Sequence, residues 1–98
     1  MKFVWLPKAI ANRHALIDYI AQDNLRAAIE QDSHIDVQTD QLAVHPEIGR
    51  PGRKQGTREL VITHTNFVVV YRVKPRIKHI VILRVLHTSQ AWPAESKN

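Results

Sequence analysis

The spacing of apolar residues changes midway along the chain, and this change limits the folds open to it. In the first half, apolar side chains recur at helical intervals, as Ile10, Ile17 and Ile20 do. A loop at residues 49–56 holds all three glycines, and after it the spacing is that of strands. A chain whose helices are followed by a run of strands favours an α+β domain.

The expected order of elements is β-α-α-β-β-β. A short first strand at Lys2–Leu6 precedes a helix from Pro7 to Gln22, and Asn24 caps a second helix that ends before His45-Pro46. The last three strands are predicted at Thr57–Thr63, Phe67–Lys74 and Lys78–His87. Their short connections indicate an antiparallel meander.

These elements predict two layers, with an antiparallel helix hairpin on a mainly antiparallel sheet whose other face is more open. The core stripe of the second helix is expected to consist of Leu25, Ala28, Ile29, Ile35 and Leu42. Asp32 and Thr39 interrupt this stripe, so we expect them at its edge or near a partner. Residues 1–93 are predicted to form a single domain, and residues 94–98 a disordered tail.

Charge is divided unevenly between the halves of this 98-residue chain, whose net charge is +5. Residues 1–49 carry four basic and seven acidic side chains, and residues 50–98 carry ten basic and two acidic ones. The basic half predicts an acidic partner, either nucleic acid or protein. The absence of cysteine excludes disulfides and thiol chemistry. No apolar run is long enough for a membrane span or a signal peptide, so a cytoplasmic protein with no membrane partner is expected.

Several segments in order resemble one known family, the RelE/ParE superfamily of bacterial type II toxins, and most closely its ParE branch. The matching segments are Ile17–Asn24, His45–Gly52, Gly56–Val61, Val69–Val73, Ile82–His87 and Gln90–Pro93. The resemblance covers almost the whole chain.

This resemblance implies a cytoplasmic toxin held inactive in a hetero-oligomer with a cognate, ParD-like antitoxin that folds on binding. It implies contact with operator DNA only through the antitoxin, and a role in plasmid stabilisation. The ParE branch is associated with poisoning DNA gyrase, whereas the RelE branch cleaves mRNA on the ribosome. Because one fold hosts both activities, the branch must be argued from the residues.

Three arginines are the main candidates for target binding. Arg58, Arg72 and Arg84 lie on three consecutive strands, and Lys54 lies in the preceding loop. Alternation would let Arg58 share a face with residues 60 and 62, and Arg84 share a face with residues 80, 82 and 86. We therefore hypothesise that the three guanidinium groups converge on the open face of the sheet.

His87 is the best candidate for a general acid or base, and the alternative is a strand-end histidine bonded to backbone. Glu59 is expected to form a structural pair with Arg58. Trp92 either packs back on the helices or serves as an exposed anchor for the target. The remaining histidines show no metal-ligand spacing, and no glycine-rich loop precedes a helix, so neither a metal nor a cofactor is expected.

The interpretation that follows is a gyrase inhibitor that acts by binding, without catalytic residues of its own. Its candidate contacts are Arg58, Arg72, Arg84, His87 and Trp92. The alternative is a ribosome-dependent mRNA endonuclease, which the lack of any tyrosine after Tyr71 disfavours. A third possibility is a degenerate toxin that only binds its antitoxin.

Overall fold

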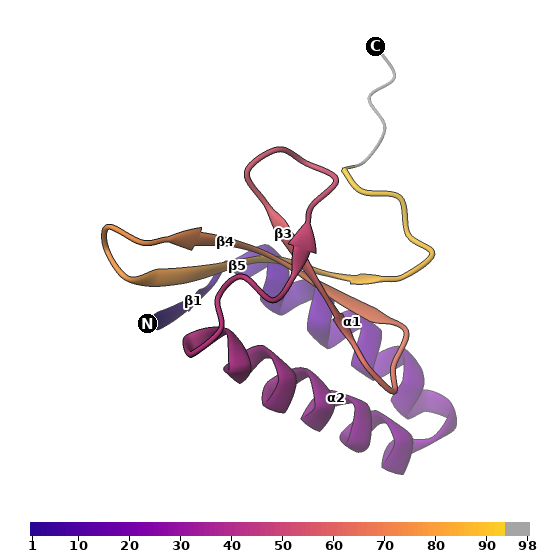
Figure 1. Ribbon diagram of the computed structural model, residues 1–98. Coiled ribbons are helices and arrows are strands. Elements are labelled where there is room, and N and C mark those ends of the chain that lie inside the picture. Colours follow the sequence, from indigo (N-terminus) through magenta and orange to yellow (C-terminus); the bar gives the residue numbers. More distant parts are fainter. Residues whose placement is uncertain (94–98) are drawn as a thin grey trace.

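Two helices pack on one face of a five-stranded sheet in the computed structural model, which describes residues 1–93 (Figure 1). The helices are α1 (Pro7–Asp23) and α2 (Leu25–Asp40), and the short 3-10 helix η1 (Gln41–Ala43) follows them. The strands are β1 (Lys2–Trp5), β2 (Arg50–Pro51), β3 (Arg58–Ile62), β4 (Phe67–Lys74) and β5 (His79–His87). The predicted α+β, two-layer fold is confirmed. The predicted tail at residues 94–98 lies outside the described residues.

The sheet has the order β1-β5-β4-β3-β2, and only β1 runs parallel to its neighbour. In that pair Phe3 lies opposite Ile80 and Trp5 opposite Ile82. The Leu6 N–H also donates to the Ile82 carbonyl at 3.0 Å, so α1 begins directly beside β5. The two-residue strand β2 was not predicted, because the sequence there is typical of a loop.

The helix hairpin is held by a polar clamp between α1 and α2. The Asn24 side chain accepts from the Ala27 N–H at 3.0 Å, as the predicted cap requires. Arg13 on α1 binds the carboxylates of Asp32 at 2.7 Å and Asp36 at 2.8 Å. Asp32 therefore interrupts the apolar stripe because it pairs with the neighbouring helix. Within residues 1–93, neither helix is long and apolar enough to cross a membrane.

The core-facing side of α2 differs from the predicted stripe. Thr39 is only 1% exposed, so its predicted position at the edge is wrong. Leu25 and Ile29 were expected in the core, yet they are 65% and 61% exposed. Ile29 lies one residue, or about 100°, around the helix from the buried Ala28, and the core stripe runs on from Ala28 through Ile35 to Thr39.

Tyr71 fastens the segment after α2 to the sheet. Its buried hydroxyl donates to the Pro46 carbonyl at 2.8 Å and accepts from the Gly49 N–H at 2.9 Å. A Cβ at residue 49 would lie 2.6 Å from this oxygen, so only glycine fits there without movement. The buried Tyr71 hydroxyl therefore fixes the position of the loop that leads to β2.

We predict that Tyr71→Phe lowers the free energy of unfolding by about 1–3 kcal/mol, because it leaves the buried Gly49 N–H and the half-buried Pro46 carbonyl without their partner. Urea unfolding followed by circular dichroism would measure this. The matched control is Tyr19→Phe at a side chain that is 73% exposed, where we expect a change below about 0.5 kcal/mol. Equal effects of the two substitutions would contradict a fastening role for the Tyr71 hydroxyl.

Candidate functional site

Alternate residues of β4 separate onto the two faces of the sheet. Val69 and Tyr71 join the main core beneath the helices, whereas Val68 and Val70 join a second buried cluster on the opposite face, here called the outer face. Arg72 continues the series of Val68 and Val70, so its side chain belongs to the outer face.

A β-bulge in β5 brings Arg84 to the same outer face. Val70 pairs with Arg84, but the next residue of β4 pairs with Ile82, so Leu83 is an extra residue in β5. Ile82 packs under the helices, while Leu83 packs against the outer cluster. The predicted single face for residues 80, 82, 84 and 86 is therefore wrong, because the bulge changes the alternation after Ile82.

Trp92 folds back on the outer face and packs against the cluster of Val68, Val70 and Leu86. Trp92 is thus packed, but the predicted packing on the helices is wrong, because its partners lie on the sheet face opposite them. Figure 1 shows the yellow segment that follows β5, up to residue 93, on the opposite side of the sheet from the helices. The face that was expected to be more open is therefore partly covered.

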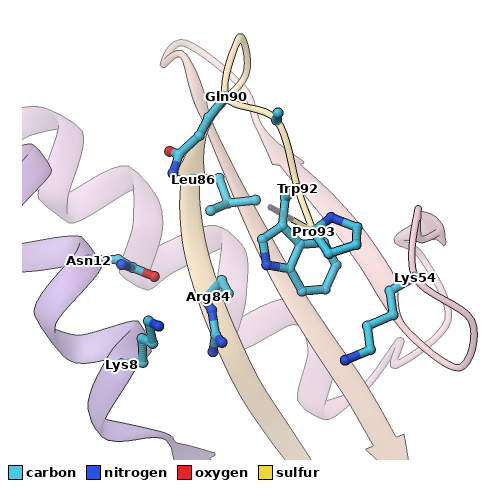
Figure 2. Close-up of a pocket in the computed structure, with 9 residues that line it drawn as sticks. Lys8, Asn12, Lys54, Arg84, Leu86, Gln90, Trp92 and Pro93 are labelled. Carbon is cyan, nitrogen blue, oxygen red and sulfur yellow. The ribbon is translucent and has the colours of Figure 1, made fainter. Parts of the chain in front are cut away.

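Beside Trp92 lies a pocket of about 310 Å³, here called the Arg84 pocket. Its polar and aromatic lining consists of Lys8, Asn12, Lys54, Arg84, Gln90 and Trp92. Figure 2 shows the Arg84 guanidinium next to the indole, with Lys8 on the helix side and Lys54 on the loop side. The three cations make no ion pair with any carboxylate of residues 1–93.

The one acidic side chain in the described part of the basic half is already neutralised. Glu59 on β3 is 1% exposed and binds Arg50 and Arg53, each at 3.0 Å. Its structural role is confirmed, but the predicted partner, Arg58, is wrong. Arg53 also donates to the Gln90 carbonyl at 3.1 Å, so the network joins the loop that carries Lys54 to the C-terminal segment.

The ionisation of Glu59 follows from these contacts. Burial by itself raises the pKa of the carboxyl, but the hydrogen bonds from the Arg53 backbone N–H and from the guanidinium groups of Arg53 and Arg50 outweigh it. The pKa of Glu59 therefore lies below its ordinary value.

Arg58 does not join the other two arginines. It pairs with Tyr71 across β3 and β4, so it shares the helix face with that tyrosine. Its guanidinium donates to the carbonyls of Gly49 at 2.8 Å and Glu47 at 3.3 Å. The predicted convergence of three arginines is wrong, because the register of β3 turns Arg58 to the opposite face from Arg72 and Arg84.

His87 lies away from the Arg84 pocket. It borders a separate cavity beneath the helices with Tyr19 and Phe67. Its Nδ1 lies 2.8 Å from the Ser89 hydroxyl and accepts from the Ser89 N–H at 3.2 Å. The structure thus brings Arg84 and Trp92 together, with Arg72 on the same face, and leaves Arg58 and His87 elsewhere.

Sequence reasoning missed Lys8 and Asn12, which reach the pocket from α1. No motif connects them to β5 at such separation in the chain. They arrive there because β1 pairs with β5 and α1 starts where that pairing ends. Only a prediction that the first and last strands pair in parallel would have indicated that Lys8 and Asn12 lie near β5.

The chemistry open to the Arg84 pocket is the binding of negative charge. Among residues 1–93, its lining contains cations, amides and an indole but no carboxylate, imidazole or phenol. Within residues 1–93 no three side chains of metal-ligating type gather as a metal site. The arrangement can hold an anionic partner, and among the described residues that line it the lysines are the only side chains of a type that commonly transfers protons.

Comparison with solved structures identifies the class of protein as the small α+β toxins of toxin–antitoxin systems. The chain superimposes on a chain of the chromosomal ParDE system of P. aeruginosa with a TM-score of 0.78 and 29% identity, covering 89% of this chain and 95% of the other. A chain of the RelBE2 toxin–antitoxin complex of Mycobacterium tuberculosis gives a TM-score of 0.58 and 25% identity, with 88% and 95% covered.

The model of the family described as the ParE toxin of the type II toxin–antitoxin system parDE matches residues 3–92. A curated relative, the protein Y4kP of Sinorhizobium fredii strain NGR234, is named as a candidate toxin. It is 35% identical over 89 residues, which are 91% of this chain and 90% of the relative. The chain belongs to the ParE toxin family and is a toxin of the type II toxin–antitoxin class.

We predict that Glu59→Gln weakens the fold and flattens its dependence on pH. Because the folded pKa is lowered, the ionised carboxylate stabilises the fold above pH 4.5, and this contribution is lost as pH falls through the folded pKa. At about pH 6 we expect the variant to be about 1.5–3 kcal/mol less stable than the wild type, the range for hydrogen bonds to charged groups.

Urea unfolding at about pH 6 and at about pH 3 would measure this difference. The wild type should lose more stability between the two than Glu59→Gln does. Glu47→Gln, at an exposed carboxyl, is the matched control and should follow the wild type. Parallel losses in the wild type and Glu59→Gln would refute the assignment of the pH dependence to Glu59.

Proposed function

We propose that this toxin inhibits DNA gyrase by binding it and stabilising a gyrase–DNA cleavage complex, and so blocks replication. The observation that carries the proposal is the Arg84 pocket, in which cations and Trp92 gather and the described lining residues include no carboxylate, imidazole or phenol. Such a surface is suited to binding, since arginine and tryptophan are frequent hot spots of interfaces.

The geometry disfavours the alternative, an mRNA endonuclease. Cleavage by a 2′-hydroxyl needs a base and an acid beside the cations that stabilise the phosphate. His87 is turned to the helix face and bonded to Ser89, away from Arg84. Membership of the ParE family adds weight to a gyrase target over a ribosomal one.

We predict that the purified toxin, incubated with gyrase, relaxed plasmid and ATP, inhibits supercoiling and causes linear DNA to accumulate. Arg84→Glu should raise the toxin concentration needed for half inhibition about tenfold or more, because it reverses a charge in the centre of the pocket. The matched control is Arg76→Glu, an exposed arginine in the turn between β4 and β5, which should inhibit like the wild type.

Normal supercoiling at a large molar excess of toxin would refute gyrase as the target. Translation arrest with cleaved transcripts, abolished by His87→Ala, would establish the endonuclease instead. Equal activity of Arg84→Glu and the wild type would remove the pocket from the gyrase contact.

A cognate antitoxin is proposed as the second partner, forming a hetero-oligomer with this toxin in the cytoplasm and alone contacting the operator. Exposed apolar side chains along α2 support it: Leu25, Ile29 and Val37 are spaced by multiples of four residues and are 60% exposed or more. Such a stripe favours an amphipathic segment that folds on binding. The basic half of the chain favours an acidic one.

We predict that Ile29→Glu weakens the complex with the antitoxin encoded by the adjacent gene about tenfold or more, since it inserts a charge into the apolar stripe. Val44→Glu is the control, because Val44 is 74% exposed and lies beyond α2. Isothermal titration calorimetry with the refolded toxin would compare the two variants. Wild-type affinity in Ile29→Glu would exclude this side of α2 as the antitoxin site.

A further inference from the structure

The Arg84 pocket collects hydrogen-bond donors whose acceptor atoms are used elsewhere. The Asn12 Oδ1 accepts from the Val85 N–H at 3.3 Å, which leaves the Asn12 amide N–H groups as donors. Gln90 is arranged in the same way, because its Oε1 accepts from the His87 N–H at 3.3 Å. A ligand here meets amide donors in addition to cations, and therefore must itself supply acceptors.

Three cations from separate parts of the chain also favour a ligand that supplies hydrogen-bond acceptors and negative charge. Lys8 comes from the first turn of α1, Lys54 from the loop before β3, and Arg84 from β5. Arg84 uses one N–H on the Leu83 carbonyl at 2.7 Å, which orients its guanidinium and leaves the other N–H groups for a ligand. Like charges brought together without a carboxylate from the described part of the chain indicate an anionic ligand such as a phosphate.

Trp92 adds a flat aromatic surface to the same pocket. The ring is half-buried and packs against the outer cluster, yet it also lines the pocket beside Arg84 (Figure 2). The carboxylates of an acidic peptide would satisfy the cations but have no aromatic ring to stack on the indole. Single-stranded nucleic acid supplies both a phosphate and an exposed base.

We propose that the Arg84 pocket binds one nucleotide unit of single-stranded nucleic acid, with its phosphate on Lys8, Lys54 and Arg84 and its base stacked on Trp92. A volume of about 310 Å³ is at the small end of ligand pockets and suits one such unit. This binding would need no gyrase, so the proposal goes beyond gyrase inhibition. It is tested with the toxin and an oligonucleotide alone, and a negative result there would be distinct from a negative result in the supercoiling assay.

The test is fluorescence anisotropy of labelled oligonucleotides of about twelve nucleotides with the full-length toxin. The probes are oligothymidylate, oligouridylate and a DNA duplex, at about 50–200 mM salt. We expect both single strands to bind more tightly than the duplex. If three phosphates are neutralised, the slope of log affinity against log salt should be about −2. Tighter binding of oligothymidylate would identify DNA as the source of the strand, and tighter binding of oligouridylate would identify RNA.

Matched variants separate the pocket from general charge. Arg84→Gln should weaken single-strand binding about tenfold and reduce the salt slope by about 0.7, whereas Arg76→Gln, with the same loss of charge, should change affinity less than about twofold. Trp92→Ala should weaken binding to single strands about tenfold and leave duplex binding unchanged. Because Trp92→Ala could loosen the C-terminal segment, Lys8→Gln at an exposed side chain is the second variant, with the same expectation as Arg84→Gln.

Three results would overturn the proposal. The first is no single-strand binding up to about 100 µM toxin, the weak end of non-specific nucleic-acid affinity. The second is equal weakening by Arg84→Gln and Arg76→Gln, which would mean that only net charge matters. The third is an oligoglutamate peptide that displaces oligothymidylate as well as unlabelled oligothymidylate does, which would make the site one for acidic peptides.

Discussion

The pairing of β4 with β5 determines which side chains reach each face of the sheet. β4 is buried on both faces along most of its length, so its alternation separates the helix core from the outer cluster. The extra residue Leu83 then changes the alternation of β5, and Arg84 emerges beside Trp92 instead of following Ile82 into the core. The candidate binding site therefore depends on one local irregularity in a strand pair.

The ion pairs of Glu59 fix the basic loop that borders that site. A buried carboxylate is costly unless it is paired, and here two arginines and a backbone N–H pair it. Through Arg53 the same network reaches the Gln90 carbonyl, and so links β3, the basic loop and the C-terminal segment. Because Glu59 is paired in this way, no carboxylate of residues 1–93 neutralises the cations of the Arg84 pocket.

Much of the fold could be predicted because local signals specify it. Pro7 and Asn24 mark the helix starts through backbone chemistry that needs no tertiary contact, and both were read correctly. The side of α2 that faces the core was harder. Leu25 and Ile29 are apolar at helical spacing, yet they lie exposed. Apolar spacing alone therefore does not distinguish the side of a helix that faces the core from an apolar side that faces solvent.

The sequence by itself determined the order of the main elements apart from β2, their approximate limits, the excess of basic charge in the second half and the resemblance to ParE toxins. Only the tertiary structure decided which basic residues meet. Arg58 and Arg84 look equivalent in sequence, but the register of β3 and the bulge in β5 turn them to opposite faces. Lys8 reaches Arg84 only because β1 joins β5. Register and pairing arise from packing between residues far apart in the chain, so short-range patterns do not contain them.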